Sequence, residues 1–206
     1  MRRTKMLGVL VAAFAAVSAF AGSAQAQSAG GSSSPPDGTF YDLPFGYRDL
    51  TMGMNGTDVQ TLNWVLRGLA LGTPHDGAFS QPTDGAVRSF QASAGLGASG
   101  VVNLYTRKAM AARMLNQKAS WYGPRFFGRR TACGKKLARK TRGVAHRKLR
   151  CGTRVAFAYK GRWVRAKVID RGPYIKGRKW DLTQRVAEEL GTTAAGTATV
   201  KAAVAP

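Results

Sequence analysis

Two carboxylates stand close together in the C-terminal half of this 206-residue chain, which holds few acidic residues. Asp170 ends the hydrophobic stretch WVRAKVID, and Asp181 follows eleven residues later in KWDLT. His146, in GVAH, is one of only two histidines in the chain. Carboxyl groups that donate and accept protons, assisted by an imidazole, can cleave glycosidic bonds. We therefore take Asp170, Asp181 and His146 as candidate catalytic residues.

Each candidate also has a purely structural interpretation. Asp170 precedes a Gly-Pro turn, where its carboxylate could accept backbone N–H bonds. Asp181 could cap a helix over residues 182–190, and His146 could be an exposed turn residue. Four further side chains could contact a sugar or pack a core: Ser120, Tyr122, Tyr174 and Trp180. The sequence has no Ser-His-Asp triad, phosphate loop or convincing metal-ligand spacing, so we predict neither a metal nor a cofactor.

The N-terminus has the pattern of an export signal. Three basic residues precede an apolar run over residues 6–20, and Ala24-Gln25-Ala26 matches a cleavage site. A membrane anchor is the alternative, but the run is short for a bilayer span and small residues follow it. We predict a signal peptide over residues 1–26 and a secreted, extracellular or wall-associated chain without a stable membrane anchor.

Export also bears on the two cysteines, Cys133 and Cys151. An even cysteine count in a secreted chain favours a disulfide. A metal site is the alternative, although it lacks a second cysteine pair and has only His146 in range.

Positive charge is concentrated in the C-terminal half. Residues 27–117 carry six basic and six acidic side chains, whereas residues 118–206 carry 23 Lys and Arg against four acidic residues. Such a surface attracts polyanions. Nucleic acid is one candidate partner, but export favours anionic polymers of the cell wall. We predict wall polymers as partners, no nucleic acid, and a monomeric chain.

Composition and periodicity divide the chain into four segments. The signal peptide is followed by a disordered Ser/Gly/Pro linker over residues 27–47 and a helical unit over residues 48–115. A polar junction at 113–118 leads into short strands and one helix over residues 118–204, which suggest a small closed barrel.

Capping residues and apolar faces mark the three helices of the first unit. Thr57 and Gln60 form a capping-box pattern, Pro82 suits the first turn of the second helix, and Asn103 is an expected N-cap. The predicted inward faces are Val59, Leu62, Val65, Leu66 and Leu69, then Ala86, Val87, Phe90 and Ala94, and finally Leu104, Ala109 and Met110.

The helical unit resembles a known binding module. The stretches GMNGTDVQTLNWVLRGLAL, HDGAFSQPTDGAVRSFQASAGL and SGVVNLYTRKAM are similar to the small three-helix peptidoglycan-binding domain found on many wall hydrolases. Asn63 departs from the Gln that is usual there. The resemblance implies binding of the wall polymer in a groove between helices.

The second half resembles the double-psi β-barrel of rare lipoprotein A, and more distantly expansins and barwin. The motifs are ASWYG, TACG, GVAH, CGTRV, VIDRGPY and WDLT, in this order. Some members of that family are lytic transglycosylases that act on peptidoglycan strands lacking stem peptides. Their Asp and His match Asp170 and His146, but their Glu falls at Lys135. In expansins, the resemblance implies, the Asp matching Asp181 serves wall loosening without hydrolysis.

These observations predict an α+β chain in which a three-helix peptidoglycan-binding bundle precedes a six-stranded double-psi β-barrel. The expected function is peptidoglycan binding with lytic transglycosylase activity. The alternative is a non-catalytic, expansin-like wall binder, which the loss of the family Glu at Lys135 favours.

Overall fold

The computed structural model describes residues 40–206. The predicted signal peptide and most of the predicted linker lie outside the described residues. The predicted linker extends to residue 47, but the described chain is structured from Phe40. There β1 (Phe40–Tyr41) pairs with β2 (Asn55–Gly56), and Phe45 is buried against Trp163. Within residues 40–206, no helix is long and apolar enough to cross a membrane.

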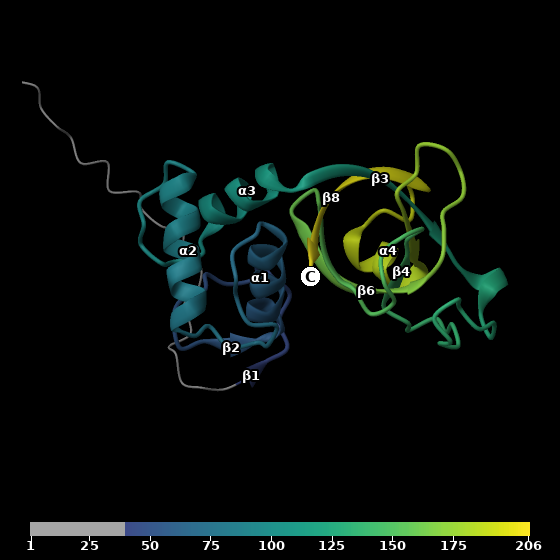
Figure 1. Ribbon diagram of the computed structural model, residues 1–206, viewed down its shortest axis with the longest axis horizontal. Coiled ribbons are helices and arrows are strands. Elements are labelled where there is room, and N and C mark those ends of the chain that lie inside the picture. Colours follow the sequence, from purple (N-terminus) through teal and green to yellow (C-terminus); the bar gives the residue numbers. More distant parts are fainter. Residues whose placement is uncertain (1–39) are drawn as a thin grey trace, which may run out of the picture. The chain divides into compact units, whose positions relative to one another are not determined.

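The first half contains the three predicted helices, α1 (Thr57–Gly68), α2 (Gln81–Ser93) and α3 (Leu104–Arg113) (Figure 1). Their predicted inward faces are largely correct: Val59, Leu62, Val65, Leu66, Val87, Phe90 and Met110 are all buried. Leu104 is the exception, because it lies in the first turn of α3 with 52% of its surface exposed.

The helix caps match the sequence only in part. Asn103 caps α3 as predicted, because its Oδ1 accepts from the backbone N–H of Thr106 at 3.0 Å. The predicted capping box of α1 is wrong. The N-cap is Gly56, and the Thr57 hydroxyl instead donates to the backbone oxygen of Leu43 at 2.8 Å. Gln60 donates to the backbone oxygen of His75 rather than back to the start of its own helix.

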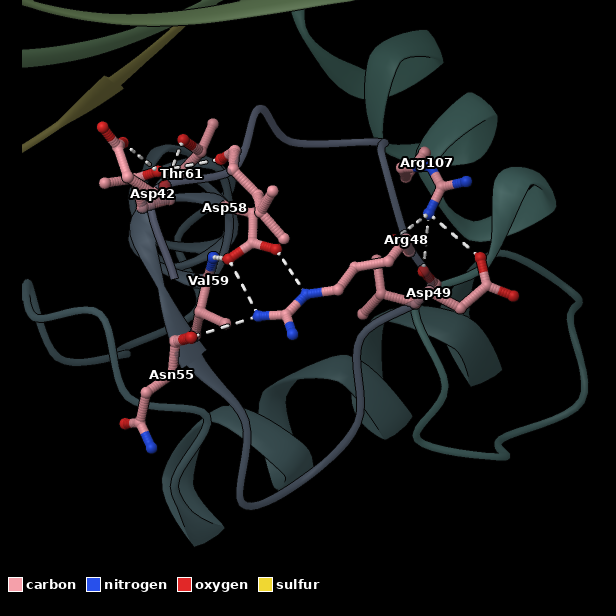
Figure 2. Close-up of polar contacts among 11 residues, drawn as sticks. Asp42, Arg48, Asp49, Asn55, Asp58, Val59, Thr61 and Arg107 are labelled. Atoms are coloured by element: carbon pink, nitrogen blue, oxygen red, sulfur yellow. Dashed lines mark hydrogen bonds and ion pairs between the residues drawn. The ribbon is translucent and has the colours of Figure 1, made fainter. Parts of the chain in front are cut away.

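A buried ion pair ties the segment before α1 to the helix start (Figure 2). Arg48 Nε lies 2.8 Å from Asp58 Oδ2, and both side chains are almost fully buried. Arg48 also donates to the backbone oxygen of Asn55 at 3.1 Å, while Asp58 Oδ1 accepts from the N–H of Val59 at 2.8 Å. Because a buried charge is costly without a partner, removing either side chain would leave the other uncompensated.

The second half forms a closed six-stranded barrel, which confirms the predicted fold class (Figure 1). Around the barrel the strand order is β3-β7-β4-β6-β5-β8. The strands are β3 (Leu115–Tyr122), β4 (Gly143–Ala145), β5 (Arg154–Tyr159), β6 (Arg162–Asp170), β7 (Trp180–Thr183) and β8 (Thr197–Ala205). The 3₁₀ helix η1 (Pro124–Phe126) follows β3, and α4 (Gln184–Leu190) follows β7.

Two element boundaries differ from the prediction. The polar segment 113–118 is not a junction, because β3 begins at Leu115 and pairs antiparallel with β8. The helix expected at 182–190 begins at Gln184, since residues 180–183 pair with β3 and β4 as strand β7. The β5–β6 hairpin turns at Lys160-Gly161 as predicted, with Tyr159 opposite Arg162.

The barrel packs against the helical half of the chain. Ala156, Ala158, Ala203 and Ala205 point away from the barrel core and join the core that α1 and α2 build. A side chain on Gly68 would meet Ala203 Cβ at 2.6 Å, so the helix can lie this close only without one. Arg165 of β6 also donates to the side-chain oxygen of Gln60 in α1. The two halves therefore share one apolar core.

Candidate functional site

The candidate residues form one row across four neighbouring strands. Ser120 of β3 lies opposite Asp181 of β7, and Asp181 lies opposite Ala145 of β4. A shift of register after Val144 then places Ala145 opposite Asp170 at the end of β6. Such irregularities re-aim side chains at the ends of strands. Asp170 and Asp181 are therefore two strands apart, which puts their Cα atoms about 10 Å from each other.

Asp170 is oriented by backbone donors. Its Oδ1 accepts from the N–H of Ala132 and the N–H of Arg171, both at 2.8 Å. Oδ1 therefore behaves as the structural interpretation of Asp170 expects, since it accepts backbone N–H bonds at the turn, whereas within residues 40–206 Oδ2 does not. Among the described residues Oδ2 has no hydrogen-bond partner, and the residue is half-buried. The Arg171 guanidinium turns to the backbone oxygen of Leu149 at 3.1 Å instead of the carboxylate.

Asp181 is a strand residue and not a helix cap. Its Oδ1 accepts from the Ser120 hydroxyl at 2.8 Å, and the N-cap of α4 is Thr183. Burial raises the pKa of Asp181 above its ordinary value, and the negative charge of Asp170 adds to this rise. The Ser120 hydrogen bond and the charge of Arg178 oppose it. Asp181 thus keeps its proton to a higher pH than an exposed carboxyl.

His146 is buried, so the interpretation as an exposed turn residue is wrong. Its Nδ1 accepts from the N–H of Leu149 at 2.9 Å and of Lys148 at 3.2 Å. Nδ1 therefore carries a lone pair, and the neutral ring has its proton on Nε2. Burial, together with the positive charges of Lys179, Arg147 and Arg171, lowers the pKa of His146 to about 4. At neutral pH the ring is an uncharged hydrogen-bond donor.

Tyr122 is the last residue of β3 and lies two residues beyond Ser120. Its hydroxyl is buried and has no hydrogen-bond partner in the described part of the chain. Burial raises the pKa of Tyr122, and the charges of Asp170 and Asp181 raise it further. A buried hydroxyl without a partner is uncommon and costly, so Tyr122 has a free donor within the field of both carboxylates.

The other two candidates behave differently. Trp180 is completely buried, so in this structure it packs the barrel and does not reach a sugar. Its indole lies edge-on to Phe157, with ring centroids 5.2 Å apart, and under His146 at 4.6 Å. Trp180 therefore supports the imidazole. Tyr174 follows the Asp170 turn and is 78% exposed, and no hydrogen bond joins it to the other candidates within residues 40–206.

The predicted disulfide joins Cys133 to Cys151, with Cα atoms 5.8 Å apart. Cys133 directly follows Ala132, whose N–H holds Asp170, and the Cys133 N–H itself donates to the backbone oxygen of Ile169. No sequence pattern indicates the Ala132 contribution, since a backbone donor has no side-chain signature. Lys135 in the same loop is exposed, and its backbone pairs with Thr131.

The surrounding electrostatics leave both carboxylates unpaired. Within residues 40–206, no ion pair involves Asp170 or Asp181. No group of three or more His, Cys, Asp and Glu side chains in that range could hold a metal ion. The row thus holds Asp181, whose pKa is raised, and Asp170, whose Oδ2 has no partner in the described part of the chain. His146 and Tyr122, each next to or near the row in sequence, add two neutral hydrogen-bond donors. A carboxyl that holds its proton can donate it and a carboxylate with a free oxygen can accept one, so these side chains could serve general acid–base chemistry.

Two family models match this chain, one in each half. Residues 115–202 match the model of a family described as lytic transglycolase, and residues 55–110 match a peptidoglycan binding domain. A relative in Aquifex aeolicus, named "Probable endolytic peptidoglycan transglycosylase RlpA", is 47% identical over 75 residues. That match covers 35% of this chain and 33% of the relative.

Two further matches complete the comparison. An "Endolytic peptidoglycan transglycosylase RlpA" of Campylobacter jejuni is 36% identical over 85 residues, covering 40% of this chain and 31% of the relative. The chain thus spans about a third of the length of these curated relatives. A solved expansin from Clavibacter michiganensis overlaps with 44% of this chain and 50% of its own, at 18% identity and a TM-score of 0.36.

Proposed function

We propose that this chain, in which a rare lipoprotein A-like β-barrel follows a peptidoglycan-binding domain, is an exported wall protein that cleaves glycan strands as a lytic transglycosylase. One observation carries the proposal. Asp170, matching the family's Asp, and Asp181, whose pKa is raised, lie in one row two strands apart.

In a lytic reaction the hydroxyl on C6 of the sugar forms a new bond to C1 while the bond from C1 to the glycosidic oxygen breaks. One group must accept the hydroxyl proton and one must supply a proton to the departing oxygen. Asp170 Oδ2 accepts the proton of the C6 hydroxyl as the new C6–O–C1 bond forms. Asp181 donates its proton to the glycosidic oxygen as the C1–O bond breaks. Asp181 thereby takes the part of the acid that Lys135 replaces.

Neutral donors complete the proposed site. The N–H on Nε2 of His146 donates a hydrogen bond to a sugar oxygen, and the buried Tyr122 hydroxyl keeps an unused donor in the field of both carboxylates. Ser120 holds Asp181 in place at 2.8 Å, and Tyr174 offers an exposed ring for a sugar face. The two backbone N–H groups on Asp170 Oδ1 fix that carboxylate with Oδ2 available.

The basic surface supports a second partner class. The barrel half carries 23 Lys and Arg against four acidic residues, many of them on the loops around residues 125–150. Because exposed cations attract polyanions, we include anionic wall polymers among its partners and place the chain outside the cytoplasm.

Product analysis tests the activity directly. Purified stem-free glycan strands are digested with the chain, and the products are identified by mass spectrometry. We expect products that end in 1,6-anhydro sugars, and Asp170→Asn should abolish them while wall binding stays intact. A wild-type chain that binds wall but releases no such product at any pH would favour the non-catalytic, expansin-like binder. The presence of Lys135 where the family has Glu favours that alternative.

A further inference from the structure

A groove of about 510 Å³ lies between α3 and the turn that joins β5 to β6. Lys108 and Ala111 line it from α3, and Trp163 lines it at the start of β6. Asp170 ends the same strand seven residues later. At about 3.3 Å per residue, the groove and the carboxylates are roughly 23 Å apart along β6. This site is therefore separate from the catalytic row.

The floor of the groove is apolar and made of small or flat side chains. Ala158 is 4% exposed, Trp163 and Tyr159 are half-buried, and Ala111 completes the surface. Such a floor has room for methyl groups and short aliphatic segments, and its volume suits a ligand of a few residues.

All charged residues that line the groove are positive, beside the neutral Asn116 and Thr199. Lys108 comes from α3, Lys160 from the hairpin turn and Lys201 from β8, and no acidic residue lines the groove. Arg107 also lines it, but its guanidinium is engaged with Asp49 at 3.2 Å. None of the three lysines forms an ion pair within residues 40–206. Three ammonium groups thus surround an apolar floor without a counter-charge from the protein.

We propose that this groove binds a short acidic peptide with small side chains, the chemistry of the stem peptides on peptidoglycan strands. Carboxylates of the peptide pair with the lysines, and its methyl groups lie on the alanine and tryptophan surface. A neutral glycan could not form ion pairs with the three lysines. A phosphate polymer could form such pairs but has less apolar surface to place on the floor of the groove. This inference rests on the proposed function in one respect: the proposed function names peptidoglycan as the polymer that carries the peptide.

The position of the groove gives it a role in substrate selection. A peptide-bearing part of the wall held there lies roughly 23 Å from the carboxylates along β6. The stretch of glycan presented to Asp170 and Asp181 is then a different one from the stretch whose peptide is bound. The groove would thus direct cleavage to stem-free glycan beside peptide-bearing wall.

Titration calorimetry with the full chain tests the groove. The probe is the stem tetrapeptide freed from glycan, and the comparison probe is the same peptide with its carboxyl groups amidated. We expect Lys108→Glu/Lys201→Glu to weaken tetrapeptide binding at least about tenfold, as the loss of two ion pairs implies. Amidation should weaken binding to wild type by a similar factor. The matched control is Lys140→Glu/Lys167→Glu, which makes the same charge change at exposed positions outside the groove and should bind like wild type.

Each outcome decides the inference. Equal tetrapeptide affinity of wild type and the groove variant would overturn it, as would competition by stem-free glycan at the Trp163 indole N–H in NMR spectra. Equal weakening in the control variant would reduce it to a general charge effect. Product release from stem-free strands is measured on the same variants and should not change. A further outcome is that wild type releases no products while only the groove variant, and not the control variant, binds the tetrapeptide more weakly than wild type. In that case the proposed catalysis fails and the groove assignment stands.

Discussion

Ala132 and Asp170 are joined by a 2.8 Å hydrogen bond from the backbone N–H of Ala132 to Oδ1 of Asp170. The donor is one residue away from the Cys133–Cys151 disulfide, which holds its loop against the end of β6. The orientation of the proposed base therefore depends on a backbone group that a covalent link keeps in place.

Replacing Ala132 by proline should lower product release strongly, because proline has no N–H to donate to Asp170. Ala132→Gly keeps the N–H and is the matched control, with activity near wild type. Anhydro-sugar release is measured by mass spectrometry and folding by circular dichroism. A natively folded Ala132→Pro chain with wild-type turnover would show that this hydrogen bond does not matter.

Removing the disulfide should cost stability as well as activity. Cys133 and Cys151 are 18 residues apart, and closing a loop of that size contributes about 3 kcal/mol to the free energy of unfolding. We expect Cys133→Ser/Cys151→Ser to lose about that much in urea denaturation. Alkylation of the wild-type chain before and after reduction should label two thiols only after reduction. Free thiols in native material would contradict the pairing.

Asp181→Asn should reduce turnover by about 10² or more, because the amide cannot supply the acid proton. Since the pKa of Asp181 is raised, its protonated form persists above the range of an ordinary carboxyl and is lost as pH rises through that pKa. Ser120→Ala removes a hydrogen bond that lowers this pKa, so the alkaline limb of the kcat/KM profile should move to higher pH. An unchanged limb would contradict Asp181 as the acid.

His146 should make the fold sensitive to mild acid. The pKa of its imidazole is about 4 in the folded chain against an ordinary value of about 6.5. The unfolded state therefore binds a proton over that interval while the folded state does not, so stability falls as pH drops from about 6.5 to 4. His146→Asn should flatten this part of the curve of unfolding free energy against pH. Parallel curves for the two chains would refute the assignment.

Breaking the buried ion pair should be far more costly than breaking an exposed one. Arg48→Met leaves the Asp58 carboxylate buried without its partner, and we expect a loss of about 3–5 kcal/mol in the free energy of unfolding. Arg88→Met removes a half-exposed pair with Asp84 on α2 and should cost less than about 1 kcal/mol. The double change Arg48→Met/Asp58→Leu should regain most of the loss, and a double variant no better than Arg48→Met would contradict this account.

Local patterns were enough to predict most of the elements. The apolar positions of α1 and α2, the Asn103 cap and the β5–β6 hairpin all depend on neighbours within a few residues. The errors arose where partners are remote in sequence. Leu115 is a strand residue because Ala202 pairs with it, and Thr57 is not a cap because Leu43 takes its hydroxyl.

The candidate site shows the same division. Asp170, His146 and Asp181 were identifiable from side-chain type and motif, and the strands bring all three to neighbouring positions. For Trp180 the packing interpretation follows from the alternation in WDLT: Trp180 and Leu182 point into the barrel while Asp181 points out of it. Ala132 could not have been found, because its contribution is a backbone N–H brought close by folding.

The alanines on the outer wall of the barrel have one more consequence. The core of the helical half is completed by four barrel alanines, Ala156, Ala158, Ala203 and Ala205, and Gly68 packs closely on Ala203. Separating the two halves would therefore expose apolar surface of both to water. Heating should therefore melt both in a single calorimetric transition.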